Sequence, residues 1–296
     1  MKQKNLHKKT KNSNIHLNSL ITESRNSATI YLHTLSTTEI LKIMNKEDES
    51  VPLAVQNVIP AIKDAVEIIV RQFKKGGRLF YVGAGTSGRL GILDASEAPP
   101  TFGVKSTMIQ GIIAGGRRAV FKSIEGAEDL ETEGANALRK IKISSHDTVI
   151  GISASGRTPF VIGALKFAKT VGAARIGISC NSNAILRKYV DVPVLPILGP
   201  EVITGSTRLK AGTAQKLVLN MISTTAMIKL GKVQSNLMID LLPKCEKLSV
   251  RAKRIITQLT GCSKPTADKL LKSSNGDIRK AILLFEEKSA KTKLKK

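Results

Sequence analysis

Residues 78–103 constrain the fold of this chain more than any other stretch. They read RLFYVGAGTSGRLGILDASEAPPTFG, in which an apolar run at 79–82 leads into a turn of small residues at 83–88. The apolar run predicts a buried strand, and the glycines of the turn let backbone N–H groups come close to a ligand. Because a following helix also presents free N–H groups, and Thr86 and Ser87 add hydroxyls, the turn suits an anion.

Nucleotide-binding loops are the first alternative for such a turn. It lacks the Gly-Lys-Ser/Thr ending of a P-loop. Its glycines at 83, 85 and 88 have the G-x-G-x-x-G spacing, but a dinucleotide site also needs an acidic residue near the end of the next strand, and residues 104–113 contain none. We set a dinucleotide site aside, while an ordinary tight turn stays open for this stretch taken alone.

A second turn of the same kind follows another apolar run. Residues 147–152 predict a strand that leads into SASGRTP at 153–159, and the tripeptide Ser-Gly-Arg occurs at 87–89 and again at 155–157. Parallel strands end at the same edge of a sheet, so the two turns would lie along one edge. Each turn could hold phosphate or sugar oxygens, so we call residues 83–88 the first clamp and residues 153–159 the second clamp. Two such clamps at one edge predict a phosphosugar site.

Apolar strands alternate with amphipathic helices along most of the chain. This order predicts an α/β protein with a doubly wound, mostly parallel sheet. We expect a long helix at 51–73, kinked at Pro60. The other elements are expected as strands at 108–113, 175–179 and 192–197, and as helices at 132–141, 159–171 and 214–230.

Three further segments complete the predicted organisation. Residues 1–20 are polar and Lys-rich and predict a disordered basic extension, residues 21–240 form the main domain, and residues 241–296 form a small three-helix bundle with a Lys-rich tail. The acidic residues at 125–129 fit either the solvated start of a helix or part of a site. The segment 201–213 should present another helix N-terminus to an anion or to a partner's carboxylate.

Composition narrows the class of partner. The chain has 296 residues and a formal net charge of +24, but only 3% of its residues are aromatic, so it offers few platforms for base stacking. We expect solvated basic tails and no specific nucleic-acid binding.

With neither a membrane-spanning run nor a signal peptide, the sequence predicts a cytoplasmic protein with no membrane contact. Cys180, Cys245 and Cys262 lack metal-ligand spacing, so no metal site is expected.

Five long motifs carry a resemblance to a known family. They lie at 81–104, 124–131, 152–165, 199–221 and 231–241, and the first reads YVGAGTSGRLGILDASEAPPTFGV. They closely resemble N-acetylmuramic acid 6-phosphate etherases, and the likeness extends from about Leu20 to Phe285. The resemblance implies a sugar isomerase (SIS) fold, a homodimer, no cofactor, and a small C-terminal domain similar to ubiquitin-associated bundles.

The resemblance also implies a reaction and its residues. The family removes the D-lactyl ether of N-acetylmuramic acid 6-phosphate in cell-wall amino-sugar recycling, as a carbon–oxygen lyase. Its two glutamates fall on Glu97, expected as the acid, and Glu128, expected as the base; the reverse division of roles stays open. An apolar, buried setting at 91–100 would raise the pKa of Glu97 and favour it as the acid. The residues expected to bind substrate are Gly85, Thr86, Ser87, Ser153, Ser155, Gly156 and Thr158.

Three rival functions remain at this point. The fold and helical appendage also resemble glucokinase regulatory proteins, which sense sugar phosphates without catalysis; the presence of both glutamates favours an enzyme. An aldose–ketose phosphosugar isomerase would need the same acidified C2 proton but no departing C3 substituent. A nucleic-acid-binding SIS regulator would need a helix-turn-helix unit, which the N-terminal sequence does not predict.

Overall fold

The computed structural model describes residues 20–241, 243 and 245–293, and side chains as far as residue 290. The predicted disordered extension at 1–20 therefore lies outside the described residues except for Leu20, which is buried. The last residues of the Lys-rich tail, 294–296, also lie outside.

A five-stranded sheet forms the centre of the molecule, and all of its strand pairs are parallel. The strand order is β2-β1-β3-β4-β5, so the chain starts in the middle and winds outward in both directions. The prediction of a doubly wound parallel sheet is confirmed. The strands are β1 (Leu79–Gly83), β2 (Ile109–Ile113), β3 (Thr148–Ile152), β4 (Ala174–Ile178) and β5 (Val192–Val194).

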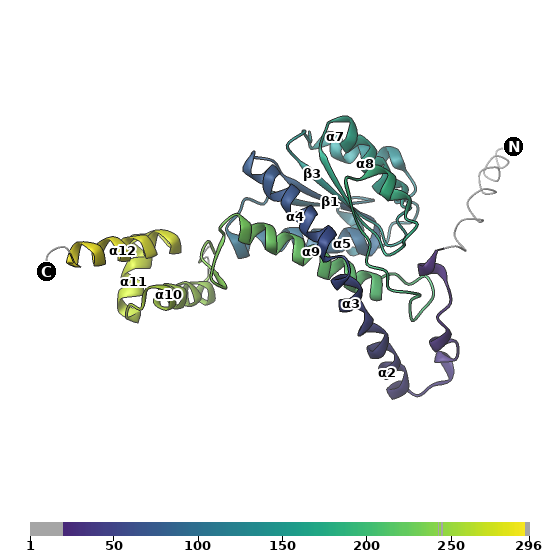
Figure 1. The fold of residues 1–296 in the computed structure, drawn as a ribbon, viewed down its shortest axis with the longest axis horizontal. Helices are drawn as coiled ribbons and strands as arrows, with labels where there is room; N and C mark the ends of the chain where they lie inside the picture. Colours follow the sequence, from purple (N-terminus) through teal and green to yellow (C-terminus); the bar gives the residue numbers. More distant parts are fainter. Residues whose placement is uncertain (1–19, 242, 244, 294–296) are drawn as a thin grey trace.

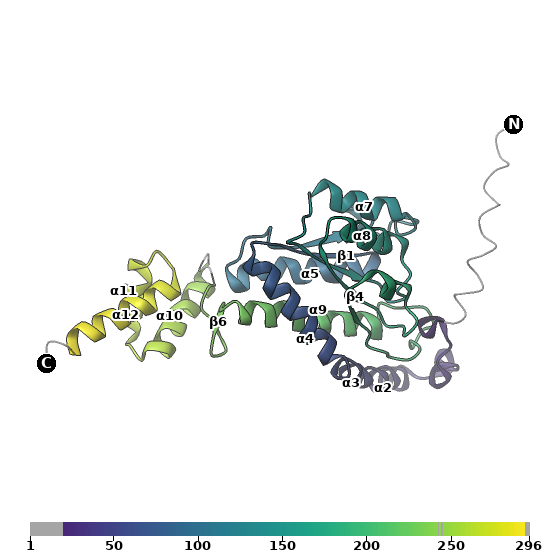
Figure 2. The same cartoon turned by 45° about the horizontal axis from the view of Figure 1, so that its top comes forward.

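Helices cover both faces of this sheet (Figures 1 and 2). Successive side chains of a strand point to opposite faces, so in β1 Leu79 and Tyr81 belong to one apolar cluster whereas Phe80 and Val82 belong to the other. The first cluster packs under α4 (Ile59–Lys74), α5 (Gly85–Phe102) and α9 (Lys210–Lys229); the second packs under α7 (Glu131–Lys140) and α8 (Pro159–Thr170). Strands buried on both faces explain the continuous apolar runs of the sequence.

The N-terminal helices differ from the prediction at Pro60. The stretch 51–73 forms two helices, α3 (Ser50–Gln56) and α4, and Pro60 lies in the first turn of α4. Proline has no N–H, and the first turn of a helix needs none, so Pro60 starts a helix and does not kink one. Before α3 come the 3-10 helices η1 (Ile21–Glu23), η2 (Ser27–Thr29) and η3 (Leu32–Thr34), and then α2 (Thr37–Asp48).

The C-terminal helices have an apolar cluster of their own. They are α10 (Glu246–Thr260), α11 (Lys264–Ser273) and α12 (Ile278–Lys293), and residues such as Ile256, Leu270 and Ile282 are buried among them. A short hairpin that the sequence did not predict, β6 (Val233–Gln234) and β7 (Leu237–Met238), joins α9 to this bundle. The connection is fixed by Arg279, whose guanidinium donates to the Asp240 carboxylate at 3.0 Å.

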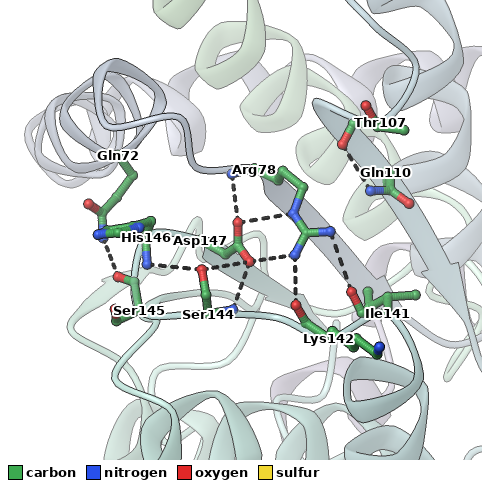
Figure 3. Close-up of polar contacts among 10 residues, drawn as sticks. All are labelled: Gln72, Arg78, Thr107, Gln110, Ile141, Lys142, Ser144, Ser145, His146 and Asp147. Carbon is green, nitrogen blue, oxygen red and sulfur yellow. Dashed lines mark hydrogen bonds and ion pairs between the residues drawn. The ribbon is translucent and has the colours of Figure 1, made fainter.

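The edge of the sheet where the strands begin is held by an ion pair. Asp147 precedes β3, and its carboxylate accepts hydrogen bonds from the backbone N–H and the guanidinium of Arg78, which precedes β1, and from the N–H of Ser144 (Figure 3). Burial acts to raise the pKa of Asp147, but these hydrogen bonds and the charge of Arg78 outweigh it, and the pKa is lowered. This network fixes the adjacent strands β1 and β3 at the end remote from the two clamps.

Candidate active site

The first clamp lies where β1 passes into α5. Gly83 and Gly88 approach so closely that a Cβ on Gly83 would lie 2.6 Å from the Gly88 nitrogen, which explains the requirement for glycine. Gly85 opens the helix with φ of +52° and is exposed. Thr86 is half-buried against α9, and Ser87 is buried.

Ser87 is engaged with a residue that the sequence motifs do not single out. Its hydroxyl lies 2.9 Å from the amide oxygen of Gln215, in the second turn of α9. Gln215 is only 1% exposed, and its Nε2 has no hydrogen-bond partner within the described residues. Gln215 lies within the motif at 199–221, but nothing in the sequence marks its contact with Ser87, because the two residues are 128 positions apart and meet only in the folded chain.

The second clamp is a compact hydroxyl cluster after β3. The Ser153 hydroxyl lies 2.8 Å from that of Thr158 and 3.3 Å from that of Ser155, and it accepts the N–H of Gly156 at 3.0 Å. Thr158 is the residue before α8, but its side chain makes no capping bond to that helix. These hydroxyls therefore do not cap α8, since they bond to one another and to the loop.

Sheet register brings the two clamps together. Gly83, the last residue of β1, is paired with Ile152, the last residue of its neighbour β3. Ser87 and Ser153 therefore follow the carboxyl ends of adjacent parallel strands, where open α/β sheets bind ligands. The geometry suits a group with several oxygen atoms, such as a phosphate.

Glu128 lies in the loop before α7, and its backbone is hydrogen-bonded to the segment that follows the second clamp. Its carbonyl accepts the N–H of Phe160, in the first turn of α8, at 3.0 Å. Desolvation, and then the charges of Asp129 and Glu125, raise the pKa of the Glu128 carboxyl, although the residue as a whole is exposed. The stretch 125–129 forms turns, and α7 begins at Glu131, so it is not a helix start.

Glu97 lies on the exposed side of α5, and here the prediction of a buried, apolar setting is wrong for the single chain. Helix α5 runs without a break from Gly85 to Phe102 and buries Asp94, Ala95 and Ala98, which leaves Glu97 facing outward. The buried apolar residues around Glu97, such as Ala95 and Ala98, belong to the inner face of the same helix, whereas Leu93 is exposed. A linear pattern does not separate the two faces.

A buried network fixes α5 one turn before Glu97. The Asp94 carboxylate accepts hydrogen bonds from Tyr81 of β1 at 2.8 Å and from Asn220 and Ser223 of α9 at 2.7 and 3.1 Å. Desolvation raises the pKa of Asp94 more than these bonds lower it. The network sets the rotation of α5 against the sheet and α9, and thereby the direction in which Glu97 points.

The N-terminus of α9 already holds an anion from its own chain. The two carboxylate oxygens of Glu201 accept the N–H groups of Lys210 and Ala211, both at 2.9 Å, and Glu201 is buried. The prediction that segment 201–213 offers its helix N-terminus to a ligand or a partner is therefore wrong. The positive end of the helix is satisfied internally.

The described part of the chain has a further hollow, away from the clamps. A groove of about 870 Å³ lies between α4 and α9, and it is lined by apolar residues such as Val66 and Met221 with several lysines, but none of the predicted site residues lines it. No group of three or more His, Cys, Asp and Glu side chains in the described residues could hold a metal ion. Nor does any helix among them combine the length and apolarity needed to cross a membrane.

The parallel sheet with hydroxyl-bearing turns at the ends of β1 and β3 defines an SIS-domain protein. A family model of the glucokinase regulatory protein N-terminal SIS domain matches residues 61–169. The solved structure of a phosphoheptose isomerase from Francisella tularensis has the same fold, with a TM-score of 0.50 at 14% identity over 66% of this chain and 100% of that chain.

Sequence relatives define the family more closely. A relative from Caldanaerobacter subterraneus subsp. tengcongensis is 56% identical over 95% of this chain and 92% of its own length, and one from Rhizobium rhizogenes is 53% identical over 90% and 87%. Both are named N-acetylmuramic acid 6-phosphate etherase. This chain belongs to the N-acetylmuramic acid 6-phosphate etherase family.

Proposed function

We propose that this protein is an N-acetylmuramic acid 6-phosphate etherase, which converts its substrate and water into N-acetylglucosamine 6-phosphate and D-lactate. The observation that carries the proposal is the 56% identity to a relative of that name over 95% of the chain. The two neighbouring hydroxyl clamps support a phosphosugar substrate, and the SIS fold accommodates one.

Chemistry accounts for the need for two carboxyl groups. Opening of the sugar ring exposes an aldehyde at C1, which acidifies the proton on C2. A base removes this proton, lactate leaves from C3 as an acid protonates its oxygen, and water then adds to the double bond at C3 with return of a proton to C2. No redox change occurs, and one water is consumed for each lactate released.

Glu128 is the proposed base and Glu97 the proposed acid. The raised pKa of Glu128 supports its role, because a more basic carboxylate removes a carbon-bound proton more readily. Glu97 protonates the departing lactate oxygen and later activates the water. The clamp residues Gly85, Thr86, Ser87, Ser153, Ser155, Gly156 and Thr158 are proposed to hold the phosphate and the sugar hydroxyls.

The proposal includes the organisation of the protein. The homodimer, the lack of a cofactor and a small separate domain at 241–296 follow from the family resemblance, and the cytoplasmic location follows from the sequence prediction. The separate apolar cluster of α10, α11 and α12 supports that domain boundary.

Release of D-lactate from N-acetylmuramic acid 6-phosphate tests the function. Wild-type protein should release lactate, and Glu97→Gln and Glu128→Gln should each lower kcat by a factor on the order of 10²–10⁴, as expected when a general acid or base is removed. Binding of the sugar phosphate without lactate release would indicate a sensor. Interconversion of glucosamine and fructose 6-phosphates would indicate an isomerase.

A further inference from the structure

The carbonyl oxygen of Ala154, in the second clamp, accepts three hydrogen bonds. The donors are the backbone N–H of Cys180 at 3.0 Å, the hydroxyl of Ser179 at 3.1 Å and the side-chain amide of Asn181 at 2.9 Å. All three donors lie in the loop that follows β4, the neighbour of β3 in the sheet. Because a carbonyl oxygen has only two lone pairs, three donors from one loop fix its direction.

The direction of this carbonyl determines what the second clamp offers to a ligand. In a trans peptide the C=O and the N–H point in opposite directions, so the N–H of Ser155 points away from the loop that holds the Ala154 carbonyl. This N–H donates to no atom of the described residues. Hydrogen bonds to a carbonyl also polarise its peptide and strengthen the N–H as a donor. The Ser155 N–H is therefore oriented in advance for an anion or a sugar oxygen.

Asn181 differs from the other two donors because its side chain also contacts a distant part of the chain. It is 2% exposed; its Oδ1 accepts the N–H of Ile21 at 2.9 Å, and its Nδ2 also donates to the Thr22 hydroxyl at 3.2 Å. Only one orientation of the amide fits, because a turned amide would place its oxygen against the Ala154 carbonyl and its NH₂ against the Ile21 N–H. Ile21 and Thr22 therefore decide which end of Asn181 faces the second clamp.

Residues 20–29 are held to the molecule by further contacts of their own. The carbonyl of Thr22 accepts the N–H of Gly205 at 3.1 Å, and the hydroxyl of Thr29 donates to the carbonyl of Val202 at 2.9 Å. Both partners lie between β5 and α9. The segment is thus an ordered part of the carboxyl edge of the sheet, and the buried amide described above connects it to the second clamp.

We propose that Asn181 is a positioning residue of the phosphosugar site, and that Ile21 and Thr22 hold it in its working orientation. Both hydrogens of its amide are used within the protein, so it acts through the Ala154 carbonyl and not by contact with the substrate. This inference rests on the proposed function, because it takes the second clamp as a place where the sugar phosphate binds.

Two substitutions at Thr22 test the inference with little change of shape. Thr22→Val removes the hydroxyl that accepts from Asn181, whereas Thr22→Ser keeps it. Thr22→Val should raise KM for N-acetylmuramic acid 6-phosphate about three- to tenfold, the effect of one hydrogen bond. It should leave kcat within about twofold, because the clamp holds the substrate equally in the ground state and the transition state. Thr22→Ser should keep KM within about twofold of wild type.

Thr29→Val is the matched control. It removes a hydrogen bond of the same segment that does not involve Asn181, so KM should stay within about twofold of wild type. Asn181→Ala removes the whole connection and should raise KM at least about tenfold. Adding Thr22→Val to it should change KM no further, because Thr22 acts on the clamp through Asn181. If Asn181→Ala does not fold, the Thr22 pair decides.

The affinity for N-acetylglucosamine 6-phosphate, measured by calorimetry, tests the clamp without catalysis and should fall in parallel with the rise in KM. Wild-type KM and affinity in Thr22→Val would overturn the inference and leave the proposed function standing. An equal rise of KM in Thr29→Val, or a double variant in which the two effects multiply, would also overturn it.

Failure of the proposed function has a different signature. If wild-type protein bound N-acetylglucosamine 6-phosphate but released no lactate from N-acetylmuramic acid 6-phosphate, the proposed function would be wrong, and the affinities of the Thr22 variants would decide the inference. If wild-type protein bound neither sugar phosphate, both would be overturned.

Discussion

The Ser87 hydroxyl lies 2.9 Å from the amide oxygen of Gln215 and so joins the start of α5 to the second turn of α9. The other end of the same amide, Nε2, is buried without a partner in the described part of the chain. Turning the amide by 180° would let Nε2 donate to Ser87, which would leave the hydroxyl proton of Ser87 free for a phosphate. In the structure Ser87 donates to Gln215, so the orientation of this amide would determine whether the Ser87 proton is available to a phosphate.

Gln215→Glu is expected to weaken phosphosugar binding. A carboxylate accepts the Ser87 proton and adds negative charge beside the clamp, so KM for the sugar phosphate should rise at least about tenfold, equivalent to about 1.4 kcal/mol. Steady-state kinetics check this. Gln215→Met, of similar length and without charge, is the control and should raise KM less; equal effects of the two variants would contradict the role in orienting Ser87.

The pH dependence of the reaction should report Glu128. A base must be ionised, so activity should rise with pH through the raised pKa of Glu128. Desolvation and the charges of Asp129 and Glu125 raise this pKa, so Asp129→Asn should lower it and move the acid limb of kcat/KM to lower pH. Glu133→Gln on α7 is the control and should leave the limb in place. If the acid limb of kcat/KM stayed in place in Asp129→Asn, the ionisation of Glu128 would not be the cause of that limb.

Two glycines of the clamps should respond differently to alanine. Gly85 and Gly156 both have positive φ, +52° and +68°, which costs an alanine about 1–2 kcal/mol. A Cβ on Gly156 would also lie 2.3 Å from the Cβ of Ala184, whereas a Cβ on Gly85 meets nothing within 4 Å. Gly156→Ala should therefore lose about 1–3 kcal/mol more in the free energy of unfolding. Urea denaturation measures both, and equal losses would contradict the crowding.

Asp147→Asn should destabilise the protein in a pH-dependent way. The folded pKa of Asp147 is lowered, so its contribution is present above the unfolded value near 3.9 and is lost as pH falls through the folded one. We expect a loss of about 1–3 kcal/mol at neutral pH, which shrinks below about pH 4. Urea denaturation across pH checks this.

Asp191→Asn provides the matched comparison. Asp191 accepts the backbone N–H of Arg175 at 2.8 Å and pairs with the Arg175 guanidinium, but its side chain is 41% exposed. An exposed pair contributes only about 0–1 kcal/mol, so this variant should be nearly as stable as wild type. If both variants lost equal stability, burial would not be what makes the Arg78–Asp147 pair important.

Sequence reasoning succeeded where the signal was local. The apolar runs of β1 and β3 and the glycine-rich turns after them depend on neighbouring residues, and the clamp at Ser153 could be read from the order SASGRTP. The predictions failed where a single helix has a buried face and an exposed face, or where one sequence pattern fits two structures. Glu97 was expected to be buried because apolar residues surround it in the sequence, but the buried ones, such as Ala95 and Ala98, lie on the other side of α5.

By itself the sequence determined the alternation of strands and helices, the two hydroxyl turns and the family, because backbone conformation and burial follow short-range patterns of residue type. Tertiary structure alone decided that Gln215 meets Ser87, that Glu201 occupies the N-terminus of α9, and that Glu128 is tied to Phe160. These contacts join residues as much as 128 positions apart. Only the packing of helices on a sheet of fixed register brings such side chains within hydrogen-bond distance, and no local pattern encodes which of them will meet.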